Sequence, residues 1–254
     1  MYLLVDCGNT LIKWALADAD GIVARGRVVH DGRRDAAIDE VAQLINADIV
    51  AIYVASVLEA AFSAALCAAL GPAARRLEVV SPAYGIEIAY RDASALGVDR
   101  WLAMVAAKAN VDEKATGPVC VVSAGTAVTF DAIAADGRHL GGYIWPGPHL
   151  VADVLATHTD GIGHTPVAID ARADRRPLGT DTDTAVGYGS LFAIASAIDR
   201  AAKIAMPKCD ALPRLLLTGG DAELIFPWLD TPATIEPDLV IEAMMVIATS
   251  RESK

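Results

Sequence analysis

Short apolar runs alternate with polar turns along the chain, and the first of them establish a pattern that returns later. Tyr2–Val5 predicts a buried strand, and two further strands are expected at Leu11–Ala17 and Ile22–Val29. Because the segments between them are short and polar, the three strands should form an antiparallel meander. In the second half of the chain Val119–Val122 predicts another strand, and Ser123–Thr126 is the turn that follows it.

Beyond the meanders the chain continues as alternating helices and strands. Helices are predicted at 36–45, 58–70, 99–110, 149–157 and 184–205, with strands at 49–55, 77–80 and 215–218 and closing helices after the last strand. The sequence therefore predicts an α/β protein with mixed sheets. We expect two duplicated halves, 1–115 and 116–254, with a tight boundary near Glu113–Gly117.

The polar turn at Asp6–Lys13 carries groups that suit a nucleotide phosphate and its metal ion. Mg²⁺ favours carboxylate oxygens such as those of Asp6, and Gly8 lets the backbone approach an anion without a Cβ in the way. Asn, Thr and Lys side chains in this turn supply donors and a positive charge. An ordinary hairpin turn would use similar residues. Lys13 inside an apolar strand and the repeat at Ser123 favour the phosphate site, with one ligand held between the halves.

A second candidate cluster lies at the start of the helix predicted at 99–110. As an N-cap, Asp99 would accept hydrogen bonds from backbone N–H groups, which is a purely structural role. Arg100 beside it favours a binding role, because a guanidinium binds a carboxylate through two parallel hydrogen bonds. An aspartate next to it can accept a hydroxyl proton. With Tyr90, this pair suits a small substrate that carries both an alcohol and a carboxylate.

Composition and missing motifs narrow the class of protein. A net charge of −11 argues against a generic nucleic-acid binder, which needs a basic surface. The four cysteines are far apart, and no secretory signal or bilayer-spanning apolar segment is evident. We therefore predict a cytoplasmic protein without a membrane partner. Neither a G-x-x-x-x-G-K-[ST] loop nor a G-x-G-x-x-G turn after a strand occurs, so hairpin turns must build any phosphate site.

Several motifs in this order resemble those of type III pantothenate kinases. They are Asp6-x-Gly-Asn-Thr-x-x-Lys13, Gly97-Val-Asp-Arg100, Ala124-Gly-Thr-Ala127, Gly141-Gly-Tyr-Ile-Trp-Pro-Gly147 and Thr218-Gly-Gly-Asp221. The resemblance spans nearly the whole chain. It implies two actin-like (ribonuclease H-like) domains with a nucleotide cleft between them. It also implies ATP-dependent phosphorylation of pantothenate to 4′-phosphopantothenate, the first step of coenzyme A synthesis.

The resemblance also assigns roles to the residues that match the motifs. Asp99 would be the general base that acts on the pantothenate hydroxyl, and Asp6 would hold Mg²⁺. The ATP phosphates would be bound by Asp6, Cys7, Gly8, Asn9, Thr10, Leu11, Ile12, Lys13 and Thr126. Pantothenate would be bound by Tyr90, Gly97, Val98, Asp99, Arg100 and Thr182. The family is usually homodimeric, and Thr182 would reach the substrate across the dimer interface.

Ser123 departs from the family pattern. Many members have Asp at this position, and that Asp helps to bind an activating K⁺ or NH₄⁺. A neutral hydroxyl is a weaker ligand for a cation than a carboxylate. The resemblance implies a monovalent cofactor, and we expect weaker binding of that cation at Ser123.

Two other functions stay open. A kinase for another small hydroxy acid would share the hairpins but not the Tyr90, Asp99 and Arg100 pocket. A nucleotide-binding regulatory protein of the same fold would keep the hairpins without the chemistry.

Some polar residues have no motif around them. His149, His158 and His164 match no compact zinc spacing and are expected on loops or the surface, with Asp160 as a nearby acid. Asp131, which closes the second strand of the later meander, would face either the phosphates or a turn.

Overall fold

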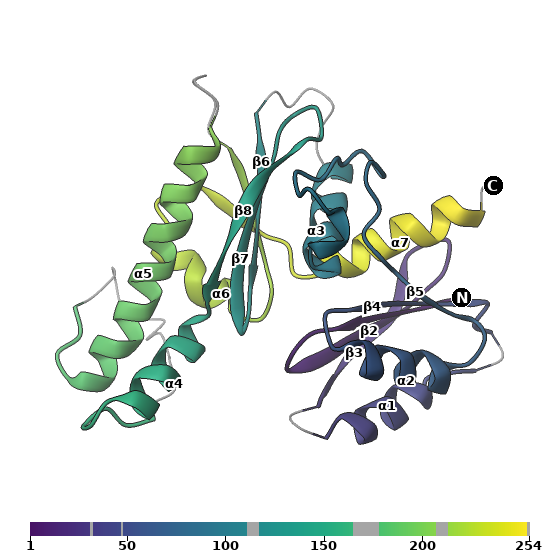
Figure 1. Cartoon of the computed structure of the whole chain (residues 1–254), viewed down its shortest axis with the longest axis horizontal. Coiled ribbons are helices and arrows are strands. Elements are labelled where there is room, and N and C mark those ends of the chain that lie inside the picture. The colour runs from purple at the N-terminus through teal and green to yellow at the C-terminus, as the bar shows by residue number, and fades with distance from the viewer. Residues whose placement is uncertain (31–32, 47, 111–116, 165–177, 207–212, 253–254) are drawn as a thin grey trace. The chain divides into compact units, whose positions relative to one another are not determined.

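The computed structural model describes residues 1–30, 33–46, 48–110, 117–164, 178–206 and 213–252. The chain folds into two compact units, and each unit is built on its own five-stranded sheet (Figure 1). Unit 1 comprises Met1–Ala83, Tyr90–Ala106 and Asp238–Lys254, and unit 2 comprises Tyr84–Ala89 and Ala107–Pro237. None of the helices in the described ranges combines the length and apolar character that a bilayer crossing requires.

The sheet of unit 1 begins as the predicted antiparallel meander and continues with strands parallel to the first. In the order β3-β2-β1-β4-β5, its strands are β1 (Tyr2–Cys7), β2 (Leu11–Ala17), β3 (Ile22–Val29), β4 (Ala51–Ser56) and β5 (Ala74–Arg76). The central strand β1 is almost wholly buried, because the sheet is covered on both faces. A strand covered on both faces reads as a continuous apolar run, and this explains the opening of the sequence.

Helices cover both faces of this sheet. On one face α1 (Arg34–Ala42) and α2 (Ala60–Leu70) pack on Leu3, Val5 and Ile52. On the other face α7 (Leu239–Glu252) contacts β1 and β2 (Figure 1). A short 3₁₀ turn, Ala93–Ala95, leads into α3 (Val98–Ala109). The candidate site residues Asp6 and Lys13, which alternate with the core residues Cys7 and Ile12, are therefore separated by the sheet from the core that α1 and α2 cover.

Unit 2 repeats the same sheet. In the order β10-β9-β6-β7-β8, its strands are β6 (Val119–Ala124), β7 (Ala127–Ile133), β8 (His139–Pro146), β9 (Arg214–Thr218) and β10 (Ala233–Ile235). Its helices are α4 (Pro148–His158), α5 (Thr182–Ala205) and α6 (Ala222–Ile225), with a 3₁₀ turn at Phe226–Trp228. The long helix α5 supplies much of the apolar core, including Leu191, Ile194 and Ile198.

The two sheets correspond strand by strand, so the predicted duplication and the α/β fold class are confirmed. The correspondence extends to single hydrogen bonds at the ends of the meanders. His30 N–H donates to the Thr10 carbonyl at 3.2 Å, and Gly147 N–H donates to the Thr126 carbonyl at 2.8 Å. Each donor is the first residue after the third strand of its meander. The first turns of the two units therefore end in the same way, although the turn of unit 1 is one residue longer, because Cys7 pairs with Ile12 and Ala124 pairs with Val128.

The structure differs from the predicted elements at several places. The strand expected at 77–80 lies just before it, at β5; Leu77 N–H still donates to the Val54 carbonyl of β4 at 2.8 Å, but residues 77–80 form no strand. The three-residue strand β10 was not predicted. The predicted division at residue 115 separates the two sheets, whereas the segment from Asp238 onward, with α7, belongs to unit 1. Most of the expected boundary at 113–117 lies outside the described residues.

A glycine in unit 2 provides a test of the tight packing around the later turn. Gly219 has a φ of +98°, and a Cβ there would lie 2.1 Å from the Ala124 carbonyl oxygen. We expect Gly219→Ala to lower the free energy of unfolding by about 1–3 kcal/mol, because it combines backbone strain with a steric clash. The measurement is urea unfolding followed by circular dichroism. Gly220→Ala is the control, since a Cβ there meets nothing within 4 Å. Equal losses in both variants would contradict this account.

Candidate active site

The Asp6–Lys13 turn joins β1 to β2 and is closed by a backbone hydrogen bond. Gly8 N–H donates to the Leu11 carbonyl at 3.0 Å, and a Cβ on Gly8 would lie 3.3 Å from the same oxygen. Glycine therefore fits closely here. The side chains of Cys7 and Ile12 lie in the core between the sheet and α1 and α2. These two residues can offer only backbone groups to a ligand, whereas the two residues at the tip of the turn are exposed.

Asp6 and Lys13 lie directly opposite each other in the β1–β2 ladder. Residues in such a pair share one face of the sheet, here the face away from α1 and α2. The pKa of Asp6 is raised to about 7, chiefly by burial and then by the nearby Asp99 carboxylate, while Lys13 acts in the opposite direction. The structure thus brings Asp6, Lys13 and Asp99 together within unit 1. Two carboxylates that repel each other in this way favour a cation between them.

Asp99 lies in the first turn of α3, one residue inside the helix instead of at the predicted N-cap. Its Oδ1 accepts from the Arg100 N–H at 2.8 Å, and a Cβ on Gly97 would lie 2.6 Å from the same oxygen. The absence of a side chain at Gly97 therefore leaves the space that the carboxylate occupies. The first turn of a helix is also a favourable place for a negative charge.

Arg100 is buried, with 6% of the residue exposed, while Tyr90 is 37% exposed. The guanidinium Nη1 donates to the Tyr90 hydroxyl at 3.1 Å, and its Cζ lies 5.9 Å from the centre of the tyrosine ring. A buried guanidinium needs such partners because its loss of water is costly. Tyr90 thus orients the Arg100 guanidinium next to Asp99. A guanidinium held in this way can bind an anionic substrate group.

The equivalent turn of unit 2 holds hydroxyl groups where unit 1 holds charges. Ser123 lies opposite Thr129 in the β6–β7 ladder, as Asp6 lies opposite Lys13 in unit 1. Thr126 is exposed at the tip of this turn. The second turn can therefore donate hydrogen bonds to phosphate oxygens but adds no formal charge at this pair.

The Thr218–Asp221 motif lies beside this second turn. Asp221 N–H donates to the Ala124 carbonyl at 3.1 Å, which ties the two segments together. Burial raises the pKa of Asp221, and His149, whose Nε2 lies 3.6 Å from its Oδ1, acts in the opposite direction. The Thr218–Asp221 motif, one of those that resemble the family, thus lies at the same end of the unit 2 sheet as the second turn.

Thr182 opens helix α5, and the helix start is well capped. The Asp181 side chain accepts from Thr184 N–H at 2.8 Å. Thr182 lines a largely apolar cavity of about 580 Å³ together with Trp145 of β8, Leu155 of α4 and other residues of α4 and α5. The structure places Thr182 in unit 2, apart in sequence and in unit from Tyr90 and the Asp99 cluster.

Other candidate residues agree only in part with the expectations. His149 and His158 are exposed, as expected of surface residues, and lie on helix α4. His164 is also exposed, and its Nδ1 lies 3.6 Å from Oδ1 of an exposed aspartate. In the described part of the chain, no three His, Cys, Asp or Glu side chains gather as a metal cluster. Asp131 is buried against His139, with 3.0 Å between Oδ1 and Nε2. Asp131 therefore has a structural contact inside β7 and occupies neither a phosphate-facing position nor a turn.

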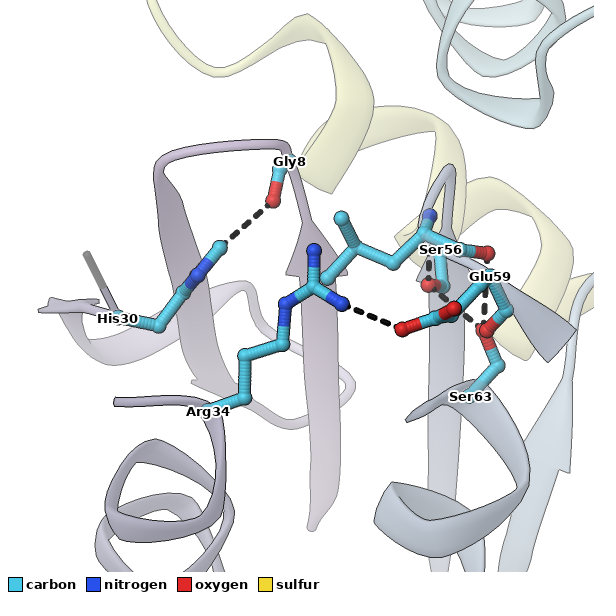
Figure 2. A network of polar contacts seen from close by, with 7 residues as sticks. Gly8, His30, Arg34, Ser56, Glu59 and Ser63 are labelled. Carbon is cyan, nitrogen blue, oxygen red and sulfur yellow. Dashed lines mark hydrogen bonds and ion pairs between the residues drawn. The ribbon is translucent and has the colours of Figure 1, made fainter. Parts of the chain in front are cut away.

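His30 was not predicted as a site residue, and its Nε2 lies 2.9 Å from the Gly8 carbonyl oxygen (Figure 2). No motif surrounds this histidine. Its position nevertheless carries a signal, because it lies two residues after the inward-facing Val28 and so continues the buried face of β3. A histidine on an apolar face at the end of a strand, beside a polar turn, indicates a possible contact to that turn.

The raised pKa of Asp6 predicts how stability depends on pH in the absence of nucleotide and metal. Between about pH 4 and pH 7 the folded state keeps a proton that the unfolded state has lost, so stability falls as pH rises. Relative to Asp6→Asn, the wild type should lose on the order of 4 kcal/mol across this window. Urea unfolding of both proteins at pH 4 to 8 measures the difference. Asp20→Asn, in an exposed turn, is the control, and parallel curves for wild type and Asp6→Asn would contradict the prediction.

Comparison with known sequences identifies relatives along the whole chain. A family model described as type III pantothenate kinase matches residues 2–203. A type III pantothenate kinase of Nitrosococcus oceani is 35% identical over 261 residues, which covers 98% of this chain and 94% of the relative. The corresponding protein of Chromobacterium violaceum is 32% identical and covers 98% of this chain and 100% of the relative.

Solved structures with low sequence identity share the fold. A conserved putative Baf family transcriptional activator from Campylobacter jejuni has a TM-score of 0.65 at 22% identity, covering 99% of this chain and 100% of that chain. A putative 2-dehydro-3-deoxygalactonokinase from Sinorhizobium meliloti has a TM-score of 0.62 at 15% identity, covering 98% and 99%. These likenesses support the actin-like kinase fold alone. The sequence matches go further, and by them the chain belongs to the type III pantothenate kinase family.

Proposed function

We propose that Asp6, Lys13, Asp99 and Arg100 carry out the reaction of this family. In that reaction ATP phosphorylates pantothenate to 4′-phosphopantothenate, the first step of coenzyme A synthesis. The protein is accordingly an ATP-dependent pantothenate kinase. The observation that carries the division of roles is the gathering of two carboxylates, a lysine and a buried arginine within unit 1.

On the nucleotide side, the Asp6–Lys13 turn binds the ATP phosphates. Its backbone N–H groups and exposed tip suit anionic oxygens, and Lys13 supplies a compact positive charge beside them. From unit 2, Thr126 would add a hydroxyl donor. Cys7, Leu11 and Ile12 would contribute through the backbone, because side chains such as Cys7 and Ile12 fill the core.

Asp6 also suits Mg²⁺. Its pKa is raised to about 7 by burial and by the neighbouring Asp99. The positive charge that the protein itself places near Asp6 therefore does not fully stabilise the ionised carboxylate. Mg²⁺ is often held by one or two carboxylates together with phosphate oxygens and water. When bound, the ion neutralises charge on the phosphates during transfer. Asp6 would hold it directly or through water.

On the acceptor side, Asp99 orients the primary alcohol of pantothenate and takes its proton. The alcohol oxygen then forms a bond to the γ-phosphorus while the bond from that phosphorus to the β–γ bridging oxygen breaks, and ADP leaves. Positioning and charge neutralisation supply most of the rate in such transfers. Gly97 keeps open the space that the Asp99 carboxylate occupies, because a Cβ there would lie 2.6 Å from it.

Arg100 binds the pantothenate carboxylate, and Tyr90 holds the guanidinium in place. A guanidinium is suited to this role by its planar set of donors. The backbone at Gly97 and Val98 completes this side of the pocket. Thr182 would contact the substrate from a partner subunit in a homodimer. Its place on the wall of an apolar cavity is compatible with a helix surface that another chain covers.

Replacing Asp99 tests the general base. Asp99→Asn keeps the shape of the side chain but cannot accept the proton, so we expect kcat to fall by a factor of about 10²–10⁴ with ATP binding retained. The measurement is pantothenate-dependent release of ADP in a coupled assay. Asp20→Asn is the control, because this exposed acid lies in the turn between β2 and β3. Turnover of Asp99→Asn within a few-fold of wild type would remove Asp99 from the mechanism.

The same assay separates the other candidate functions. ATP binding by the wild-type protein without any pantothenate-dependent ADP release would favour a regulatory protein of this fold. Faster turnover with another small hydroxy acid in a substrate panel would favour a different kinase.

Ser123 predicts a weak response to monovalent cations. We expect replacement of a large organic cation by K⁺ to change wild-type turnover little. Ser123→Asp should restore a response of about tenfold, which corresponds to about 1.4 kcal/mol from a charged ligand. Turnover is measured at constant ionic strength with K⁺ or NH₄⁺. Strong activation of the wild type would show that Ser123 does not limit cation binding.

A further inference from the structure

His30 holds the first turn of unit 1 from two sides (Figure 2). Only 2% of the residue is exposed, and its Nε2 lies 2.9 Å from the Gly8 carbonyl oxygen. A carbonyl oxygen can only accept, so Nε2 carries the hydrogen and donates it. The backbone N–H of His30 also donates to the Thr10 carbonyl at 3.2 Å. One residue therefore fixes the carbonyl groups on both sides of Asn9.

The hydrogen bond to Gly8 also sets the direction of the following N–H group. The peptide unit between Gly8 and Asn9 is trans, and the C=O and N–H of a planar trans peptide point in opposite directions. Because the Gly8 carbonyl points at the His30 imidazole, the Asn9 N–H points to the other side of the turn. A backbone N–H with a fixed direction in a polar turn is well suited to an anionic oxygen.

The imidazole itself is held by the helices beneath the turn. Its ring centre lies 6.2 Å from that of Phe62 on α2. The Arg34 guanidinium carbon lies 5.8 Å from the centre of the same phenylalanine ring. Arg34 also forms an ion pair with Glu59 (Figure 2). The donor to Gly8 is thus positioned by α1 and α2, which pack on the sheet of unit 1.

Unit 2 provides an internal comparison, because the glycine carbonyl of its first turn is held in place without a side chain. Gly147 occupies the position of His30 and makes the equivalent backbone bond to Thr126. A Cβ on Gly147 would lie 2.0 Å from the Gly125 carbonyl oxygen. That carbonyl, the counterpart of the Gly8 carbonyl, therefore packs directly on the backbone. A side chain at the end of the meander orients the glycine carbonyl in unit 1, whereas close backbone packing takes its place in unit 2.

We propose that His30 is a positioning residue for nucleotide binding. By holding the Gly8 carbonyl, it directs the Asn9 N–H at a phosphate oxygen of ATP. This inference rests on the proposed function, because it takes the Asp6–Lys13 turn as the phosphate site. A histidine that only filled the core would affect folding stability without changing the affinity for ATP.

Two substitutions at His30 separate hydrogen bonding from packing. His30→Leu fills the space without a donor, and we expect it to raise the KM for ATP by about tenfold, the effect of losing one hydrogen bond to a charged group. The KM for pantothenate should stay within about twofold, since that substrate is bound by Arg100 and not by the turn. His30→Gln offers an amide donor and should recover much of the ATP affinity. Ile38→Ala, in the same core, is the control for a loss of stability alone.

Calorimetry with ATP in the absence of pantothenate tests the inference independently of turnover. Weaker ATP binding in His30→Leu, with recovery in His30→Gln and none of the effect in Ile38→Ala, would support it. Unchanged ATP affinity in His30→Leu, or an equal loss in Ile38→Ala, would overturn it while wild-type turnover left the proposed function intact. If His30→Leu does not fold, His30→Gln and His30→Asn decide, because the shorter Asn should not reach Gly8 and should bind ATP more weakly. Equal ATP affinity in these two variants would also overturn the inference.

Discussion

The register of β1 against β2 is the constraint on which the arrangement of unit 1 depends. It places Asp6 opposite Lys13 and directs Cys7 and Ile12 into the core. A slip of one residue would exchange the two faces of the strand. Both charges would then be buried under the helices, and apolar side chains would face the ligand. Backbone bonds from Gly8 and His30 close the turn and hold this register at the end of the sheet that carries the proposed phosphate site.

The duplicated fold carries an unequal distribution of charge. Unit 1 holds two carboxylates whose repulsion contributes to the raised pKa of Asp6. At the equivalent pair in unit 2, Ser123 faces Thr129, and both side chains are neutral. The two units therefore share a fold without sharing the charges at this position. A pair of neutral hydroxyls can interact with phosphate oxygens without adding to the negative charge that a metal ion must offset.

Much of the fold could be predicted from the sequence, because hairpins and amphipathic helices are local patterns. The meander strands, the turns and the cluster around Asp99 each follow from residues that are close in the chain. The short edge strands β5 and β10 offer too few residues for a periodic signal. The roles of His30 and Asp131 could not be predicted for another reason. Each depends on a contact with a residue on another strand or turn, Gly8 and His139 respectively.

The contrast between His30 and Gly147 has a consequence for how the two halves can change. A side chain at Gly147 would strike the Gly125 carbonyl, and a glycine at position 30 would leave the Gly8 carbonyl without its imidazole donor. A single substitution at position 30 or 147 therefore does not convert one turn into the other, and each would damage the turn that it changes. The halves share one topology, but their first turns are held by contacts that cannot be exchanged. This incompatibility makes the difference between the two turns difficult to reverse by substitution.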